Sequence, residues 1–147
     1  MRGLTESGKL TRVSNAVAAG TSDVNSAVVD TQGFASCTFL VAFGAITAGA
    51  VTSCKVQQGA ASDLSDAADL AGTAVTVADD DDNQLVAIEV VEPRERYLRC
   101  VVDRGTQNAV IDGVVAIQTR AKRLPVTHDA TTVVGSELHV SPAEGTP

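Results

Sequence analysis

The sequence predicts an all-β protein built as a single β-sandwich, of jelly-roll or immunoglobulin-like type, with one short helix and extended N- and C-terminal arms. Three Val- and Ile-rich runs between Leu85 and Ala121 alternate side chains with the period of a strand. Turn signals, Glu92-Pro93 and Arg104 to Asn108, separate these runs. Hydrophobic residues make up 44% of the chain but aromatics only 3%. Small β-branched side chains of this kind pack well on pleated sheets.

The 147 residues are enough for one domain with a substantial core. Residues 1–11 are polar and rich in Gly, Ser and Thr, which predicts a flexible N-terminal arm. The sandwich is expected over residues 12–123. Residues 124–147 form a C-terminal extension, either a disordered tail or a segment whose residues 133–140 make a short exchanged strand.

The first half of the domain predicts short strands and one helix. Strands are expected at residues 12–18, 26–30, 36–43, 51–58 and 73–78. The run at 36–43 is apolar on both faces, which indicates a central strand, and we expect it to form a hairpin with 51–58. Residues 62–72 predict a helix of about two turns, with Ser62 as its N-cap and Gly72 as its stop.

The three runs from Leu85 to Ala121 predict an antiparallel meander. In the last of them Ile111, Val115 and Ile117 share a parity, and we expect all three to face the core. An aspartate in place of Ile117 is therefore expected to unfold the domain.

The charge is acidic overall and uneven along the chain. The net charge is −7, and residues 13–119 carry five basic against fourteen acidic side chains. Such a chain is repelled by nucleic acid and anionic membranes, so neither is expected as a direct partner. Both ends are more basic than the body, which suits docking onto an acidic protein surface. Six candidate contact residues lie there: Arg2, Lys9, Arg12, Arg120, Lys122 and Arg123.

Three cysteines, Cys37, Cys54 and Cys100, lack the spacing of a disulfide framework. The first residues lack an apolar leader, and no run approaches the roughly 18 to 20 apolar residues of a membrane span. We therefore expect assembly in a reducing cytoplasm, with the thiols acting as small core hydrophobes.

No motif predicts catalysis or a cofactor. Hard oxygen ligands suitable for Ca²⁺ are offered by four adjacent aspartates, Asp79, Asp80, Asp81 and Asp82. An EF-hand calcium loop that began at Asp79 would need Gly at position 84 and Glu at position 90, where this chain has Gln84 and Val90. A solvated turn is therefore the favoured interpretation.

Other titratable residues give no stronger site. His128 and His139 have no nearby Cys to complete a zinc site. Glu89, Glu92 and Glu95 flank Arg94 and Arg96, which favours surface ion pairs over paired catalytic acids.

Several stretches together resemble a known family. They are Asn15 to Ser22, Val51 to Gly59, Val75 to Gln84 (VTVADDDDNQ), Tyr97-Leu98-Arg99, and Arg104 to Ile117. These stretches are similar to small structural proteins encoded beside the capsid genes of tailed bacteriophages, and the resemblance covers residues 13–121.

The resemblance implies a capsid decoration (cement) protein. Such a protein is a β-sandwich, commonly a homotrimer, that binds the major capsid protein on the outer surface of the virion. It has no enzymatic activity and no cofactor, and it assembles in the host cytoplasm. Two alternatives stay open: another virion component, such as a tail-tube, adaptor or fibre-base protein, and a calcium- or carbohydrate-binding β module.

Overall fold

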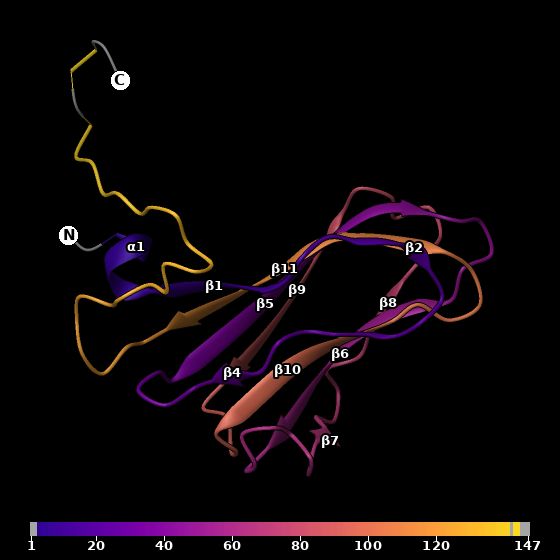
Figure 1. Cartoon of the computed structure of the whole chain (residues 1–147), viewed down its shortest axis with the longest axis horizontal. Coiled ribbons are helices and arrows are strands. Elements are labelled where there is room, and N and C mark those ends of the chain that lie inside the picture. Colours follow the sequence, from indigo (N-terminus) through magenta and orange to yellow (C-terminus); the bar gives the residue numbers. More distant parts are fainter. Residues whose placement is uncertain (1–2, 142, 145–147) are drawn as a thin grey trace.

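Two antiparallel β-sheets pack face to face in the computed structural model, which describes residues 3–141 and 143–144 (Figure 1). The first sheet contains β1 (Lys9–Ser14), β2 (Val17–Gly20), β5 (Ser36–Ile46), β9 (Leu85–Val91) and β11 (Ala109–Thr119). The second contains β3 (Val24–Asn25), β4 (Val29–Asp30), β6 (Thr52–Gly59), β7 (Ala68–Asp69), β8 (Val75–Val77) and β10 (Tyr97–Asp103). The predicted all-β sandwich is confirmed.

The structure supplies the strand order, which the sequence left open, and two of the expected strand pairings do not form. The first sheet runs β1-β11-β5-β9, with β2 also on β11; the second runs β3-β10-β6-β7, with β4 on β10 and β8 on β6. The predicted hairpin of 36–43 with 51–58 is wrong, because β5 and β6 lie in different sheets. The predicted meander is also wrong, because β9, β10 and β11 alternate between the sheets. Each of these strands has one apolar face, and its place in one of the two sheets buries that face against the other sheet.

The core consists of the inward side chains of both sheets. The alternation expected for β5, β6, β9 and β10 is confirmed. Their inward residues are buried or nearly so: Cys37, Phe39, Val41, Phe43, Cys54, Val56, Val86, Ile88, Leu98, Cys100 and Val102.

A β-bulge changes the inward parity halfway along β11. The register against β5 shifts between Ile111 and Gly113, and Gly113 has a φ of +155° that favours glycine. Ile111 is buried before the bulge and Ala116 after it, while Val115 and Ile117 turn to the outer face. The expectation that Val115 and Ile117 face the core is therefore wrong, since one extra residue reverses the faces of all that follow.

The helix expected at residues 62–72 is also wrong. Leu64 adopts a φ of +53°, which interrupts a helix, and its side chain is buried. The Asp66 carboxylate accepts hydrogen bonds from the N–H groups of Ala60 (2.8 Å) and Ala61 (3.2 Å). Asp and Ser compete with helical bonding in this way, so turns replace the helix.

The segment predicted as a flexible N-terminal arm contains regular structure over part of its described length. It forms the helix α1 (Leu4–Ser7), and β1 begins at Lys9, three residues before the expected start of the domain. The described residues contain no helix long and apolar enough to cross a membrane.

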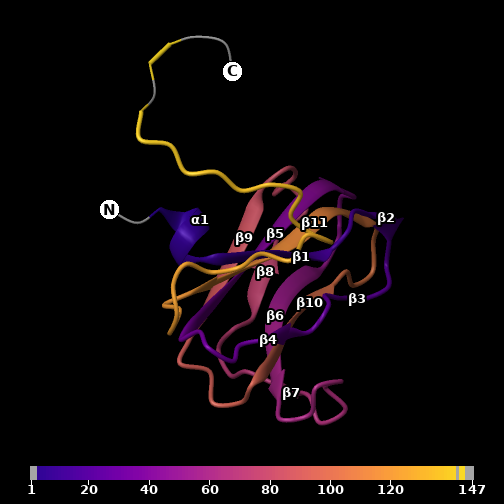
Figure 2. The same cartoon turned by 60° about the vertical axis from the view of Figure 1, so that its left-hand side comes forward.

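Hydrogen bonds hold the start of the C-terminal extension beside α1 and β1. The N–H of Val126 donates to the carbonyl of Glu6 at 2.9 Å. The His128 ring accepts from the Leu10 N–H at Nδ1 (3.2 Å), while its Nε2 lies 2.9 Å from the carbonyl of Thr5. Beyond a turn at Asp129, the chain leaves the sandwich in both views (Figures 1 and 2).

The three cysteines are buried free thiols in the core. Burial raises the pKa of Cys37 and that of Cys100 to about 12 and raises the pKa of Cys54 still further. We expect all three to react with a thiol reagent at least about 100-fold more slowly in the native protein than in denaturant at pH 8. A colorimetric thiol assay measures this ratio, and rapid labelling of any thiol in the native protein would contradict the core packing.

Candidate functional site

Three loops meet at one end of the sandwich. Strand pairing places Ser36 of β5 opposite both Val91 of β9 and Thr119 of β11. The loops that precede β5, follow β9 and follow β11 are therefore neighbours, although they are far apart in the sequence. They are residues 31–35, 92–96 and 120–127.

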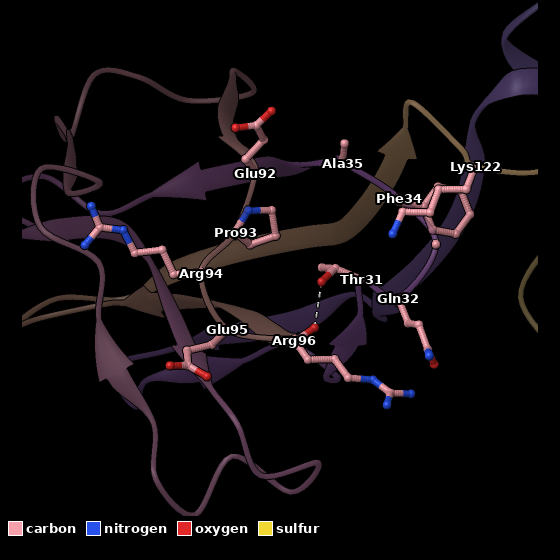
Figure 3. Close-up of a pocket in the computed structure, with 11 residues that line it drawn as sticks. Thr31, Gln32, Phe34, Ala35, Glu92, Pro93, Arg94, Glu95, Arg96 and Lys122 are labelled. Atoms are coloured by element: carbon pink, nitrogen blue, oxygen red, sulfur yellow. Dashed lines mark hydrogen bonds between the residues drawn. The ribbon is translucent and has the colours of Figure 1, made fainter.

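These loops enclose two adjoining hollows that share Gly33, Phe34 and Lys122. The first, of about 430 Å³, is also lined by the basic Arg94 and Arg96 and by the acidic Glu92 and Glu95. The second, of about 370 Å³, is also lined by Arg123 and has no acidic lining residue. Figure 3 shows the first hollow, with Phe34 and Lys122 across from the 92–96 loop. We call the joined hollows the basic groove, defined by Phe34, Arg94, Arg96, Lys122 and Arg123.

Backbone hydrogen bonds hold the walls of the basic groove in place. Thr31 donates both its N–H (3.0 Å) and its hydroxyl (2.7 Å) to the carbonyl of Arg96 (Figure 3). The N–H of Lys122 donates to the carbonyl of Gly33 at 2.8 Å. The groove is therefore formed before any partner binds, which lowers the entropy cost of binding.

One arginine of the groove is already paired. The Arg96 guanidinium donates to both carboxylate oxygens of Asp30, each at 2.8 Å, and lies 5.1 Å from the centre of the Tyr97 ring. The hydrogen bond from Arg96 lowers the pKa of Asp30. Arg94, Lys122 and Arg123 make no ion pair within the described part of the chain, so their charges face solvent.

The structure brings together part of the predicted basic set. Lys122 and Arg123 line the groove, and Arg120 and Lys9 lie at the same end of the first sheet. Arg12 instead projects from the outer face of that sheet, opposite Val115. Arg2 lies outside the described residues.

The sequence interpretation missed Arg94 and Arg96 as members of this surface. It assigned them to ion pairs with Glu89, Glu92 and Glu95. Among the described residues no such pair forms, because Arg96 binds Asp30, and Glu89 accepts a hydrogen bond from Ser36. Their place after a predicted strand, beside Pro93, was the available signal that both belong to the end of the sandwich.

The aspartate run lies at the opposite end and binds backbone groups. The N–H of Gly49 donates to Asp79, that of Ala78 to Asp81, and that of Ile46 to Asp82. These carboxylates are directed at separate N–H groups. Within residues 3–141 and 143–144, His, Cys, Asp and Glu form no group of three arranged to hold a metal.

The two histidines lie apart. His128 is bound to α1 and β1 as described, and His139 contacts Glu137 at 2.7 Å in the exposed extension. Neither side chain meets the other.

A shallow apolar hollow of about 360 Å³ lies on the outer face of the first sheet. Leu40, Ala42, Leu85 and Val115 line it, beside Arg12. The bulge at Gly113 contributes to it, because it turns Val115 outward.

Comparison with known proteins gives a fold neighbour. No protein-family model and no curated protein matches this sequence. Among solved structures, the crystal structure of PBSX exported protein XepA is similar, with a TM-score of 0.54 and 17% sequence identity. The match covers 98% of this chain and 46% of that chain, so this chain spans less than half of its neighbour. The likeness identifies the fold as a β-sandwich that occurs in a known protein.

Proposed function

We propose that this chain is a non-enzymatic structural protein of a tailed-phage virion, which decorates the capsid exterior as a homotrimer. The basic groove carries the proposal, because its basic residues outnumber Glu92 and Glu95 and lie at the same end of the sandwich as the half-buried Phe34, on a protein whose net charge is −7. An aromatic side chain with flanking cations is a typical anchor for an interface between proteins. The resemblance of residues 13–121 to decoration proteins supports a phage origin, and the fold shared with PBSX exported protein XepA is the β-sandwich that this resemblance implies.

The partner surface is predicted to be acidic. Arg94, Lys122 and Arg123 have no intramolecular carboxylate partner among the described residues, so a partner carboxylate can bind them without breaking an existing pair. A trimer presents three such grooves to neighbouring copies of the major capsid protein. Multivalency then allows weak individual contacts to give stable attachment.

Co-sedimentation with expanded capsids of the same phage, stripped of decoration, tests the proposal. The double variant Arg94→Gln/Lys122→Gln should lower the affinity roughly tenfold, because each exposed ion pair contributes up to about 1 kcal/mol. The wild-type affinity should also fall as salt concentration rises.

The charge control is Lys55→Gln/Arg99→Gln, which removes the same charge from β6 and β10 in the second sheet. It also removes the Lys55–Asp69 ion pair (2.7 Å) and the hydrogen bond from Arg99 to Gln57 (2.7 Å), so circular dichroism must first show that it is folded. This control should bind capsids as the wild type does. Equal loss in both variants would show that only net charge matters, and no capsid binding by the wild type would refute the proposed function.

A further inference from the structure

The free edge of β9 presents unpaired backbone groups. Within the described chain β9 pairs only with β5. At one end of this ladder the N–H of Phe43 donates to the backbone carbonyl of Gln84. At the other end the N–H of Glu92 donates to the backbone carbonyl of Ala35. Antiparallel pairs alternate, so the even-numbered residues of β9 bond to β5. The backbone groups of the odd-numbered residues therefore point away from the sheet: Leu85, Ala87, Glu89 and Val91.

The opposite edge of the same sheet is protected. The outward N–H of Leu10 in β1 donates to the His128 side chain, so the chain covers its own β1 edge. Nothing comparable occurs at β9 among the residues that the structure describes. Its seven residues contain one charge, Glu89, and no proline, although exposed edges are commonly protected by charges, prolines or covering segments.

The side chains of the odd-numbered residues of β9 lie on the outer face of the sheet, opposite the buried Val86 and Ile88. Leu85 is 68% exposed and Val91 is 46% exposed. Beside the edge, a cavity of about 160 Å³ opens between β8 and β9, lined in part by Phe43, Val75 and Leu85. Thr76, Asp81 and Gln84 line it as well, so an added side chain meets apolar contacts on part of its wall.

The C-terminal extension contains a segment with the pattern of a strand but no strand partner. Val134, Leu138 and Val140 share one parity, while Glu137 and His139 share the other and contact each other at 2.7 Å. Val134 is fully exposed and Val140 is 87% exposed, whereas Leu138 rests partly on Gly3. A single copy therefore leaves two aliphatic side chains of this segment in water.

Within the described residues the extension does not pair with its own β9. It leaves the sandwich at the β1 edge, and β11 and β5 separate β1 from β9. A neighbouring copy placed edge to edge brings the extension and the acceptor edge together.

We propose that residues 134–140 of one copy add as a strand to the β9 edge of a neighbouring copy. The odd-numbered residues of β9 supply the backbone hydrogen bonds, and the apolar parity of the added strand faces the cavity beside β8. Glu137 and His139 then face solvent. Because donor and acceptor lie at opposite edges, the contact is head-to-tail, and it closes into a ring when the rotation between neighbouring copies is a whole fraction of a turn. The inference concerns association between copies and does not depend on capsid binding.

Light scattering coupled to size-exclusion chromatography tests this exchange on the full chain. We expect a multiple of the single-chain mass, and a single-chain mass after deletion of residues 129–147. Val134→Asp/Val140→Asp should also give single chains. Gly135→Asp/His139→Asp should keep the assembly, because it adds the same charge on the other parity, and a Cβ at Gly135 meets nothing within 4 Å.

A second pair of variants tests the acceptor edge. Ala87→Pro removes an N–H that faces away from β5, so it should dissociate the assembly and leave each copy folded. Ala87→Thr keeps that N–H and should retain the assembly. A synthetic peptide of residues 130–144 should bind the protein truncated at residue 128 but not the truncated Ala87→Pro variant.

Three results would overturn the exchange: a full chain of single-copy mass, an assembly unchanged by the truncation, or equal effects of the two double variants. Capsid co-sedimentation of the truncated protein separates the two proposals. If the truncated protein is a single chain that still binds capsids, strand exchange is supported and the basic groove binds without it. If the full chain forms the assembly but binds no capsid, only the proposed function is refuted.

Discussion

Ala116→Asp should abolish folding, whereas Ile117→Asp should give a folded protein. Ala116 is fully buried opposite Phe39 of β5, so the new carboxylate lies in the core without a partner. An uncompensated buried charge costs about 3 to 5 kcal/mol, a large part of the roughly 5 to 15 kcal/mol that stabilises a domain. Ile117 lies on the outer face, where we expect a loss of about 1 kcal/mol.

Thermal unfolding followed by circular dichroism measures both variants. We expect Ala116→Asp to lower Tm by about 10 °C or more, or to accumulate as insoluble protein. Ile117→Asp should melt within a few degrees of the wild type. A lower Tm for Ile117→Asp than for Ala116→Asp would mean that β11 continues without the bulge at Gly113, with Ile117 in the core.

Arg104→Ala should destabilise the protein by about 3 kcal/mol, although it removes an arginine from a loop. Arg104 is only 5% exposed, and its guanidinium donates to the carbonyls of Ser22 (2.6 Å), Ala18 (2.7 Å) and Ala109 (3.0 Å). No carboxylate pairs with it in the described structure. The side chain joins β2, the turn after it and β11, and its loss leaves these carbonyls unpaired.

Urea unfolding measures this effect, with Arg99→Ala as the control. Arg99 is half-buried and makes one side-chain hydrogen bond, to Gln57 at 2.7 Å, so its loss should cost less than about 1 kcal/mol. The free energy of unfolding of Arg104→Lys should lie between those of Arg104→Ala and the wild type. A single ammonium group lacks the forked guanidinium that reaches separate carbonyls. Unchanged stability of Arg104→Ala would show that this arginine is not part of the fold's framework.

Most of the longer strands and their inward faces follow from local chemistry, whereas the strand expected at residues 12–18 is divided between β1 and β2. A period of two in β-branched residues is a property of each segment alone, so the buried sides of β5, β6, β9 and β10 were predictable. The bulge in β11 was not, because the inserted residue is defined by its register against β5. Glycine at position 113 permits the required φ, but nothing in its neighbours indicates that the chain adopts it.

Local chemistry also did not settle the segment around Leu64. The spacing of its apolar residues suggested a helix, while Asp63 and Asp66 offered carboxylates that bind backbone N–H groups in turns. The turns prevail because the fold buries Leu64 at a positive φ, a requirement set by the surrounding sheet and loops.

The sequence by itself determined the fold class, the inward residues of four strands, the core thiols and part of the basic surface. Only the tertiary structure decided which strands pair, and therefore which loops meet. Arg94 and Lys122 share one groove because β5 pairs with both β9 and β11. The same arrangement leaves β9 at an open edge. Pairing depends on contacts between segments far apart in the chain, and no local pattern records these contacts.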